Sequence, residues 1–215
     1  LGTSSTVIGI DPWKEAIDRC EQKIKKYNIT NVKVIEGVAE KMPFEENYFD
    51  LIVSNNGINN VEDMKQSLSE CRRVSKKGTQ FVLTMNLEET MIEFYDTFEE
   101  VLKANGMNNE IKKMKEHIYS KRKPLDEIKT LLIKSGFTIS AIHHESFYYN
   151  FNDATAMLNH YVIKYWFLTE WKKILIDDDL EKIFEQTENR LNETAKKNGE
   201  LQLTIPYVTI DCFKE

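Results

Sequence analysis

The chain has little cysteine, no long apolar run and no excess of positive charge. Cys20, Cys71 and Cys212 lie far apart and form no CxxC pair. This spacing argues against a bound metal, and we expect reduced, buried thiols, as in a cytoplasmic protein. No stretch approaches the roughly 18 consecutive apolar residues of a membrane span, so no transmembrane segment is predicted.

The charge balance is acidic, with 29 Lys and Arg against 35 Asp and Glu and a net charge of −6. A protein that binds duplex nucleic acid usually carries a basic face, so no nucleic-acid partner is expected. Hydrophobic residues make up 41% of the 215 and charged residues 30%, which is typical of a globular protein with a buried core. Small-molecule or lipid-like substrates fit this composition better.

Strand and helix patterns alternate in the first part of the chain. Short β-branched or apolar runs predict strands at residues 6–10, 32–35, 49–54 and 80–85. Amphipathic helices are predicted over residues 13–27 and 61–74, the second one ending in a turn at Lys76-Lys77-Gly78. This alternation is typical of βαβ units and predicts an α/β fold with a doubly wound, mostly parallel sheet.

The later part is mostly helical. Helices are predicted at about 88–104, 109–119, 124–134 and, rich in aromatic residues, across 152–198; strands are predicted at 137–143 and 201–213. A helical block between two late strands suggests an inserted lid for substrate recognition. We therefore expect a core of residues 1–151 and 199–215 with an insertion at 152–198.

The first chemical signal is Asp11, which ends the strand at residues 6–10. In open α/β sheets, ligands bind beyond the carboxyl ends of the strands. A carboxylate there can accept both hydroxyl protons of a ribose. Aspartate also favours turns and helix caps, so a purely structural role is an alternative.

The second signal is an ordered pair of motifs. The loop Gly37-Val38-Ala39-Glu40-Lys41-Met42-Pro43-Phe44 is followed by Phe49-Asp50-Leu51-Ile52-Val53, and both come after the strand that ends in an acid. In this order the chain resembles the class I, Rossmann-like S-adenosylmethionine-dependent methyltransferases, especially the ubiquinone and menaquinone biosynthesis branch. The resemblance implies S-adenosyl-L-methionine as cofactor and S-adenosyl-L-homocysteine as product.

The resemblance also implies site residues. Asp11 would hold the ribose hydroxyls, Trp13 would lie near the adenine face, and the Ala39 amide would meet an adenine ring nitrogen. Val38 stands where the family usually has an Asp that accepts from the adenine amino group, and a missing acceptor costs about 1 kcal/mol of affinity. The cofactor-binding residues implied in this way are Asp11, Pro12, Trp13, Val38, Ala39, Glu40, Asn55 and Asn56.

Three assignments stay open in the sequence. Asn55 and Asn56 border the methionine end of the cofactor in the family, but Asn-Gly also forms turns. His160 and Tyr161 are weak catalytic candidates on an aromatic helix, where Tyr161 and Tyr165 are spaced to lie together; core packing is the alternative. The lysine-rich residues 112–115 and 121–123 are expected to be a solvated face or, alternatively, to attract an anionic substrate.

Some family features are missing from the sequence or are expected only from the resemblance. The first strand and its glycine-rich loop are absent, because the chain opens at Leu1-Gly2-Thr3 before what corresponds to the second strand. We expect that an N-terminal segment has been omitted; the alternative is that Leu1-Gly2-Thr3 is a remnant of that loop joined across a gap. The strand at 201–213 fits the family's reversed last strand.

The sequence therefore predicts a methyltransferase that acts on a small-molecule or lipid-like acceptor without a metal. The alternatives are a methyltransferase-like protein that binds the cofactor without catalysis, and a nicotinamide-dependent oxidoreductase of the same fold class. The acceptor, a catalytic base and the oligomeric state are not predicted.

Overall fold

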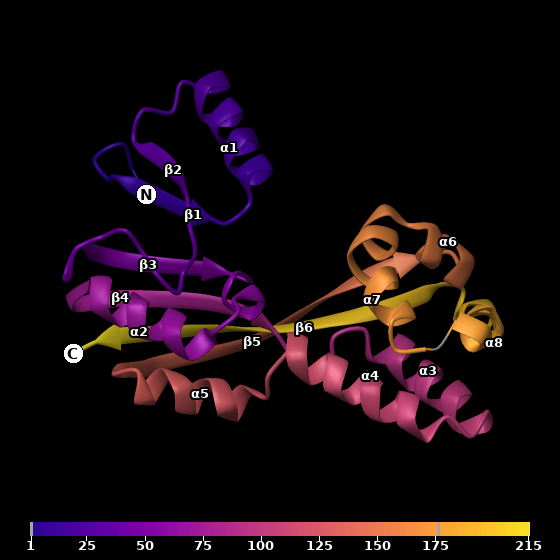
Figure 1. The fold of residues 1–215 in the computed structure, drawn as a ribbon. Coiled ribbons are helices and arrows are strands. Elements are labelled where there is room, and N and C mark those ends of the chain that lie inside the picture. The colour runs from indigo at the N-terminus through magenta and orange to yellow at the C-terminus, as the bar shows by residue number, and fades with distance from the viewer. Residues whose placement is uncertain (1, 176) are drawn as a thin grey trace. The chain divides into compact units, whose positions relative to one another are not determined.

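The structure is a computed structural model that describes residues 2–175 and 177–215. Its contacts divide the chain into two compact units. The first unit comprises Leu1–Leu83, Lys129–Ile142 and Ile210–Glu215, and the second comprises Thr84–Ile128 and His143–Thr209. Three strands contribute residues to both units: β4 (Ser75–Asn86), β5 (Phe137–Phe151) and β6 (Leu201–Lys214) (Figure 1).

Two sheets and a set of helices make this an α/β protein, as expected. One sheet has two parallel strands, β1 and β2, and the other has the order β3-β4-β6-β5. Among the described strands, β1 has only β2 as a neighbour and β3 has only β4. Each of the two sheets therefore ends in an unpaired strand edge within the first unit.

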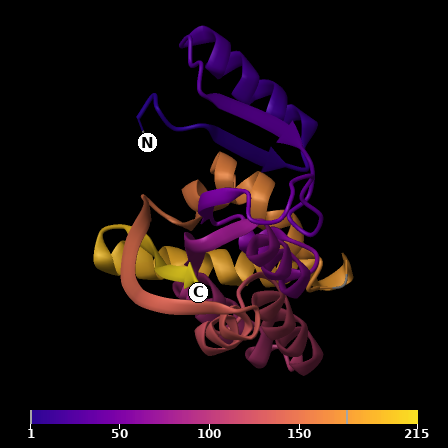
Figure 2. The ribbon, with the colours of Figure 1, turned by 90° about the vertical axis from the view of Figure 1, so that its left-hand side faces the viewer.

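The first unit opens with a βαβ element. Strand β1 (Val7–Asp11), helix α1 (Lys14–Lys26) and strand β2 (Val32–Glu36) lie within about two residues of their predicted bounds. The strands are in parallel register, with Asp11 opposite Glu36. Helix α1 lies along this small sheet (Figure 2) and buries Ile17. The carboxyl ends of both strands therefore lie side by side.

The segment after strand β3 (Phe49–Asn55) differs from the prediction. A short 3₁₀ turn, η1 (Ile58–Asn60), precedes helix α2 (Met64–Val74), which starts after Asp63. The Asp63 carboxylate accepts a hydrogen bond from the Gln66 amide at 2.9 Å, a typical helix N-cap. The true helix start is therefore set by this cap and not by the apolar pattern.

The predicted turn at Lys76-Lys77-Gly78 is wrong, because β4 begins at Ser75, directly after α2. The backbone at Gly78 has φ +80°, yet the strand continues through it. Contacts from other strands hold this part in place. The Thr79 hydroxyl donates to the Phe49 carbonyl at 2.6 Å, and the Lys214 ammonium donates to the Ser75 carbonyl at 2.6 Å.

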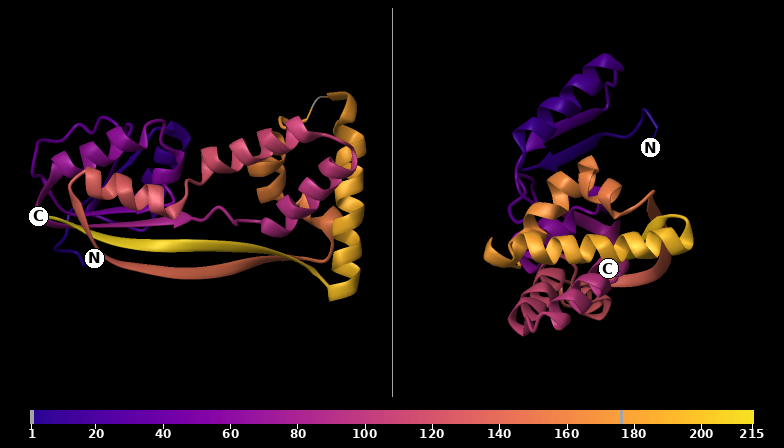
Figure 3. Two further views of the ribbon diagram at one scale, coloured as in Figure 1. Left: turned by 90° about the horizontal axis from the view of Figure 1, so that it is seen from below. Right: turned by 90° about the vertical axis from the view of Figure 1, so that its right-hand side faces the viewer.

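The second unit is mainly helical. Its helices are α3 (Ile92–Ala104), α4 (Asn108–Lys121), the start of α5 (Leu125–Lys134), α6 (Ala154–Asn159), the π-helix η2 (Ile163–Phe167), α7 (Leu168–Lys172) and α8 (Asp177–Asn198). The long helix α8 packs against α3 and α6 (Figure 3). Most of a large cluster of buried apolar side chains lies on these helices.

Two predicted bounds in this region were wrong. Helix α3 begins at Ile92 and not near residue 88, because Met91 has φ +60° and its amide donates to the Thr204 carbonyl at 2.7 Å. Strand β5 runs on to Phe151 and not to residue 143, because it pairs with the long strand β6. Both errors come from contacts between segments distant in sequence.

Aromatic rings form the centre of the second unit. The Phe94 and Trp171 rings stack with centroids 3.8 Å apart, and both side chains are fully buried. The Trp171 indole N–H donates to the Tyr95 hydroxyl at 2.9 Å. The polar atom of the largest buried side chain therefore has a partner, as burial requires.

The three cysteines are free thiols with different surroundings. Cys71 and Cys212 are buried, as expected, and burial raises the pKa of both thiols to about 12. Cys20 is exposed, so the expectation of burial was wrong for this residue. It lies on α1, whose contact with the two-stranded sheet leaves most of the helix surface uncovered.

No helix within residues 2–175 and 177–215 is long and apolar enough to cross a membrane.

Candidate functional site

Asp11 and the loop that starts at Gly37 lie at one sheet edge. The Gly37 amide donates to the Asp11 carbonyl at 3.0 Å. A Cβ atom on Gly37 would lie 2.9 Å from Ile10 Cδ1, so a larger residue at this position would require the Ile10 side chain to shift. The acid and the Gly37–Phe44 loop, which are separate signals in the sequence, are thus neighbours in the structure.

The Asp11 carboxylate already has a local role. Its Oδ1 atom accepts a hydrogen bond from the Trp13 amide at 2.8 Å, which is the turn geometry expected of the structural alternative. A carboxylate has two oxygens with several lone pairs, so this bond does not exhaust its accepting capacity. The turn also positions Trp13, whose side chain is 70% exposed, directly after the acid.

The apolar side chains predicted near an adenine ring are open to solvent. Trp13 and Val38 are exposed, Ala39 is half-buried, and Pro12 is exposed. Trp13 follows β1 and Val38 follows β2, and the carboxyl ends of these parallel strands are neighbours. This edge therefore offers apolar surface beside a carboxylate, a combination that fits a nucleoside. The contacts of these four residues with a cofactor remain predictions.

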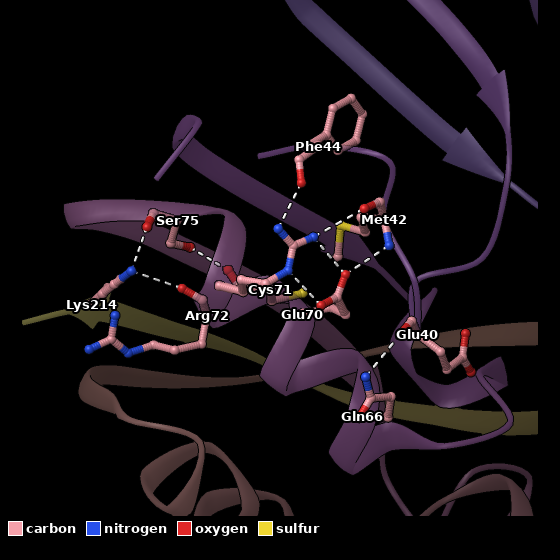
Figure 4. Close-up of polar contacts among 10 residues, drawn as sticks. Glu40, Met42, Phe44, Gln66, Glu70, Cys71, Arg72, Ser75 and Lys214 are labelled. Carbon is pink, nitrogen blue, oxygen red and sulfur yellow. Dashed lines mark hydrogen bonds and ion pairs between the residues drawn. The ribbon is translucent and has the colours of Figure 1, made fainter. Parts of the chain in front are cut away.

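Glu40 directs its carboxylate toward the start of α2. Its Oε1 accepts from the amides of Glu62 and Asp63 at 2.8 and 3.1 Å. The Gln66 side-chain amide donates to the Glu40 carbonyl at 3.2 Å (Figure 4). Glu40 thus fastens the loop to the helix N-terminus, where a negative charge is favourable. A direct contact between Glu40 and a cofactor remains a prediction.

A second set of contacts joins the loop to the C-terminal end of α2. The Arg73 guanidinium donates to the Phe44 carbonyl at 2.7 Å and to the Met42 carbonyl at 3.1 Å. It also forms a two-bond pair with Glu70, at 2.7 and 2.9 Å. Glu70 in turn accepts from the Met42 amide at 2.9 Å (Figure 4). The Arg73 hydrogen bond, with help from the Met42 amide and against the effect of burial, holds the pKa of Glu70 below its ordinary value.

Sequence reasoning missed Glu70 and Arg73. The signal was available, since their i, i+3 spacing on a predicted helix is typical of an ion pair. The spacing does not, however, reveal that the pair binds the backbone of a loop about 30 residues earlier. That contact depends on how α2 packs.

Asn55 and Asn56 come from the other sheet. Asn55 ends β3, and Asn56 has φ +53°, in the left-handed region that Asn tolerates. The Asn60 side-chain amide donates to the Asn56 carbonyl at 2.9 Å, and the Ile58 amide donates to the Ser54 hydroxyl at 3.0 Å. The turn-forming alternative is therefore present in the structure, and the cofactor contact remains a prediction.

His160 and Tyr161 lie in the second unit, just after α6. The His160 ring packs edge-on against Phe151, with centroids 5.4 Å apart, and the side chain is exposed. The Tyr161 and Tyr165 rings are 5.0 Å apart, so they lie together as their spacing predicted. Within the described part of the chain, the contacts of the His160 and Tyr161 side chains are with other aromatic rings. Their part in catalysis remains a prediction.

Glutamates pair with lysines on helix α4 and in the segment that follows it. The ion pairs are Lys112–Glu116, Lys113–Glu110, Lys115–Glu99 and Lys123–Glu127, at 3.7, 3.4, 3.3 and 2.9 Å. For these lysines the pattern favours a solvated, paired surface over a site for an anionic substrate. Arg122 is buried, so the expectation of a solvated face was wrong for that residue. Among the described residues, no group of three His, Cys, Asp or Glu could hold a metal.

Comparison with solved structures identifies the fold class. The YcgJ protein from Bacillus subtilis has a TM-score of 0.62 at 17% identity, and the match covers 98% of this chain and 83% of that one. A candidate methyltransferase from Bacillus halodurans has a TM-score of 0.61 at 19% identity, with the same coverage. At these identities the similarity shows the fold alone, which is that of an α/β protein with a mixed sheet.

Sequence comparison then narrows the class. Residues 1–83 match the family described as a methyltransferase domain. A demethylmenaquinone methyltransferase from Geobacillus sp. (strain WCH70) is 37% identical over 94 residues, which are 44% of this chain and 40% of that protein. The chain thus matches well under half the length of this curated relative. The predicted resemblance to S-adenosylmethionine-dependent methyltransferases is confirmed, and the matched residues are the first segment of the first unit.

Proposed function

We propose that this chain belongs to an S-adenosylmethionine-dependent methyltransferase whose first unit binds the cofactor. One observation carries the proposal: Asp11 and the Gly37–Phe44 loop meet at the carboxyl edge of two parallel strands, inside the segment that matches a methyltransferase domain. Ligands of open α/β sheets bind at such edges. The match favours this function over a nicotinamide-dependent oxidoreductase.

The residues of the edge fit an S-adenosyl group. The Asp11 carboxylate would accept from the ribose hydroxyls, and Trp13 would cover a face of the adenine. The backbone at Val38 and Ala39 would meet the adenine edge, with Pro12 and Glu40 shaping the turn and the loop. Asn55 and Asn56 would hydrogen-bond near the methionine end.

When bound, the cofactor supplies a methyl group on a positively charged sulfur, ready for displacement by a nucleophile. The residues of this chain would position the two partners in line and exclude water. A general base is required only if the acceptor loses a proton as it attacks. Substrate positioning therefore accounts for a site without an obvious catalytic constellation.

The acceptor in this proposal is a small or lipid-like molecule. The matched relatives act on a demethylmenaquinone, which makes a quinone-like acceptor the first to test. The match covers less than half of either chain, so it supports cofactor binding more strongly than the choice of acceptor. A cytoplasmic setting belongs to the same proposal, because free thiols persist in a reducing compartment.

The proposal also covers the roles of the late helices, of strand β6 and of the unpaired strand edges. The helices between β5 and β6 would act as a lid over the acceptor, and β6 would be the reversed last strand of the family. The unpaired edges of β1 and β3 are where a further parallel strand, with its glycine-rich loop, would complete one continuous sheet.

A specific residue favours a second candidate function. Val38 lacks the carboxylate that would accept from the adenine amino group, which fits a methyltransferase-like protein that binds the cofactor without catalysis. Cofactor binding without methyl transfer to any of a panel of quinones and lipids would favour that candidate.

The test is calorimetric titration of S-adenosylhomocysteine into the intact protein and into the variants Asp11→Ala and Asp18→Ala. We expect micromolar affinity for the intact protein, loss of binding with Asp11→Ala, and unchanged binding with Asp18→Ala, which removes an exposed carboxylate from α1. Absence of binding by the folded intact protein would refute the proposal, and NADH would then be titrated.

A further inference from the structure

The loop from Gly37 to Phe44 is fastened on both sides. On one side the Gly37 amide bonds to the Asp11 carbonyl of β1. On the other side α2 holds the Glu40, Met42 and Phe44 positions. Only Val38 and Ala39 lie between the Gly37 contact with β1 and the Glu40 contacts with the start of α2. The position of their backbone therefore depends on where these two contacts hold the loop.

The pair Glu70–Arg73 holds the Met42 and Phe44 part of the loop against α2. Through three side-chain-to-backbone bonds it holds the Met42 amide, the Met42 carbonyl and the Phe44 carbonyl. The planar guanidinium is needed for this, because it must serve two carbonyls and a carboxylate at once. The Glu70 side chain is 12% exposed and the Arg73 side chain 30%, so solvent competes only in part for these bonds.

The helix is itself connected to the strand beyond the loop. The Asn47 and Tyr48 amides donate to the Arg73 and Val74 carbonyls, at 3.0 and 2.8 Å. The end of α2 therefore contacts both the loop and the segment that leads into β3. An ion pair on a helix surface needs none of these contacts with the loop and the segment before β3.

We propose that Glu70 and Arg73 are positioning residues for the cofactor site, and that they act by holding the Gly37–Phe44 loop so that the Val38–Ala39 backbone meets the adenine. The inference rests on the proposed function. Neither side chain touches the cofactor in this account; they act through Met42 and Phe44.

The test uses variants that keep charge or size but lose the geometry. Arg73→Lys retains a cation without the planar fork, and Glu70→Gln retains the shape without the charge. Arg72→Lys is the matched control, since the Arg72 guanidinium contacts the Glu215 carbonyl and not the loop. S-adenosylhomocysteine affinity is measured by calorimetry at a temperature where every variant gives a native circular dichroism spectrum.

We expect Arg73→Lys and Glu70→Gln to weaken binding by about tenfold, and Arg72→Lys to leave it unchanged. Amide hydrogen exchange gives the readout that a merely structural role would not produce. In Arg73→Lys, exchange should become faster within residues 38–44 while β1 and α1 keep their protection.

Wild-type affinity in Arg73→Lys overturns the inference, because the lysine would then suffice. Faster exchange throughout the first unit also overturns it, since the pair would then serve overall stability alone. Lack of binding by the wild-type protein is a different result, which refutes the proposed function itself.

Discussion

At the scale of single residues, Tyr95 has a clear structural duty. Its hydroxyl accepts the one polar hydrogen of the Trp171 side chain, in a region where both side chains are almost completely buried. A buried donor without a partner is expensive, because it has lost its hydrogen bonds to water.

The substitution Tyr95→Phe should lower the free energy of unfolding by about 1–3 kcal/mol, because it leaves the Trp171 N–H unpaired. Urea unfolding followed by tryptophan fluorescence measures the change. Tyr27→Phe, at a side chain that is 64% exposed, serves as the control and should have no effect. Equal stability of Tyr95→Phe and wild type would mean that the indole finds another acceptor.

The same scale shows what the sequence could and could not predict about the site. Asp11 and Gly37 follow β-branched runs that mark strand ends, so their meeting was predictable from topology. Glu40 was predicted only as a cofactor residue, yet its carboxylate bonds to the amides of Glu62 and Asp63. Partners 22 and 23 residues away leave no mark in a local pattern.

At the scale of secondary-structure elements, the sequence predicted the bounds correctly where residues close in sequence determine them. Strands β1 and β2 were predicted closely because β-branched runs are bounded by Asp11-Pro12 and by Gly37. The turn predicted at Gly78 failed because strand pairing outweighs one glycine.

Helix α5 ends in a position where glycine is required. Gly136 follows the helix with φ +85°, and a Cβ atom there would lie 2.8 Å from Arg72 Nε. Gly106 after α3 has φ +72° with nothing within 4 Å of such an atom. An alanine at Gly106 would meet backbone strain alone, whereas an alanine at Gly136 would meet the same strain and a clash with Arg72.

We expect Gly106→Ala to destabilise the protein by about 1 kcal/mol, the ordinary penalty for a left-handed alanine, and Gly136→Ala to destabilise it by more. Thermal unfolding of both variants checks this order. Equal losses would show that the Arg72 side chain moves aside without penalty.

At the scale of the whole molecule, the pH dependence of stability follows from carboxylates that accept hydrogen bonds from other side chains. The carboxyl pKa is lowered at Glu70, Glu99, Glu127 and Glu170, first by side-chain hydrogen bonds from Arg73, Lys103, Tyr119 and Lys173 respectively. Because the folded-state pKa lies below that of the unfolded chain, these groups stabilise the fold above the unfolded pKa. That stability is lost as the pH falls through the folded-state pKa.

The urea midpoint should therefore fall steadily as the pH is lowered from about 6 to about 3. Because three of the four donors, Lys103, Tyr119 and Lys173, are exposed, salt should weaken the dependence. The Glu70→Gln variant should show a shallower acid decline than wild type. A midpoint that is constant over this range would contradict the assigned pairings.

The open edges of β1 and β3 have a consequence for handling the protein. An unpaired strand presents a row of backbone donors and acceptors, which invites pairing with a neighbouring molecule. Val53 on β3 adds apolar surface there, being 63% exposed. Where no further strand covers these edges, self-association through them would rise with concentration and would compete with folding during expression. Turbidity and yield would then report whether the edges are covered before any ligand is added.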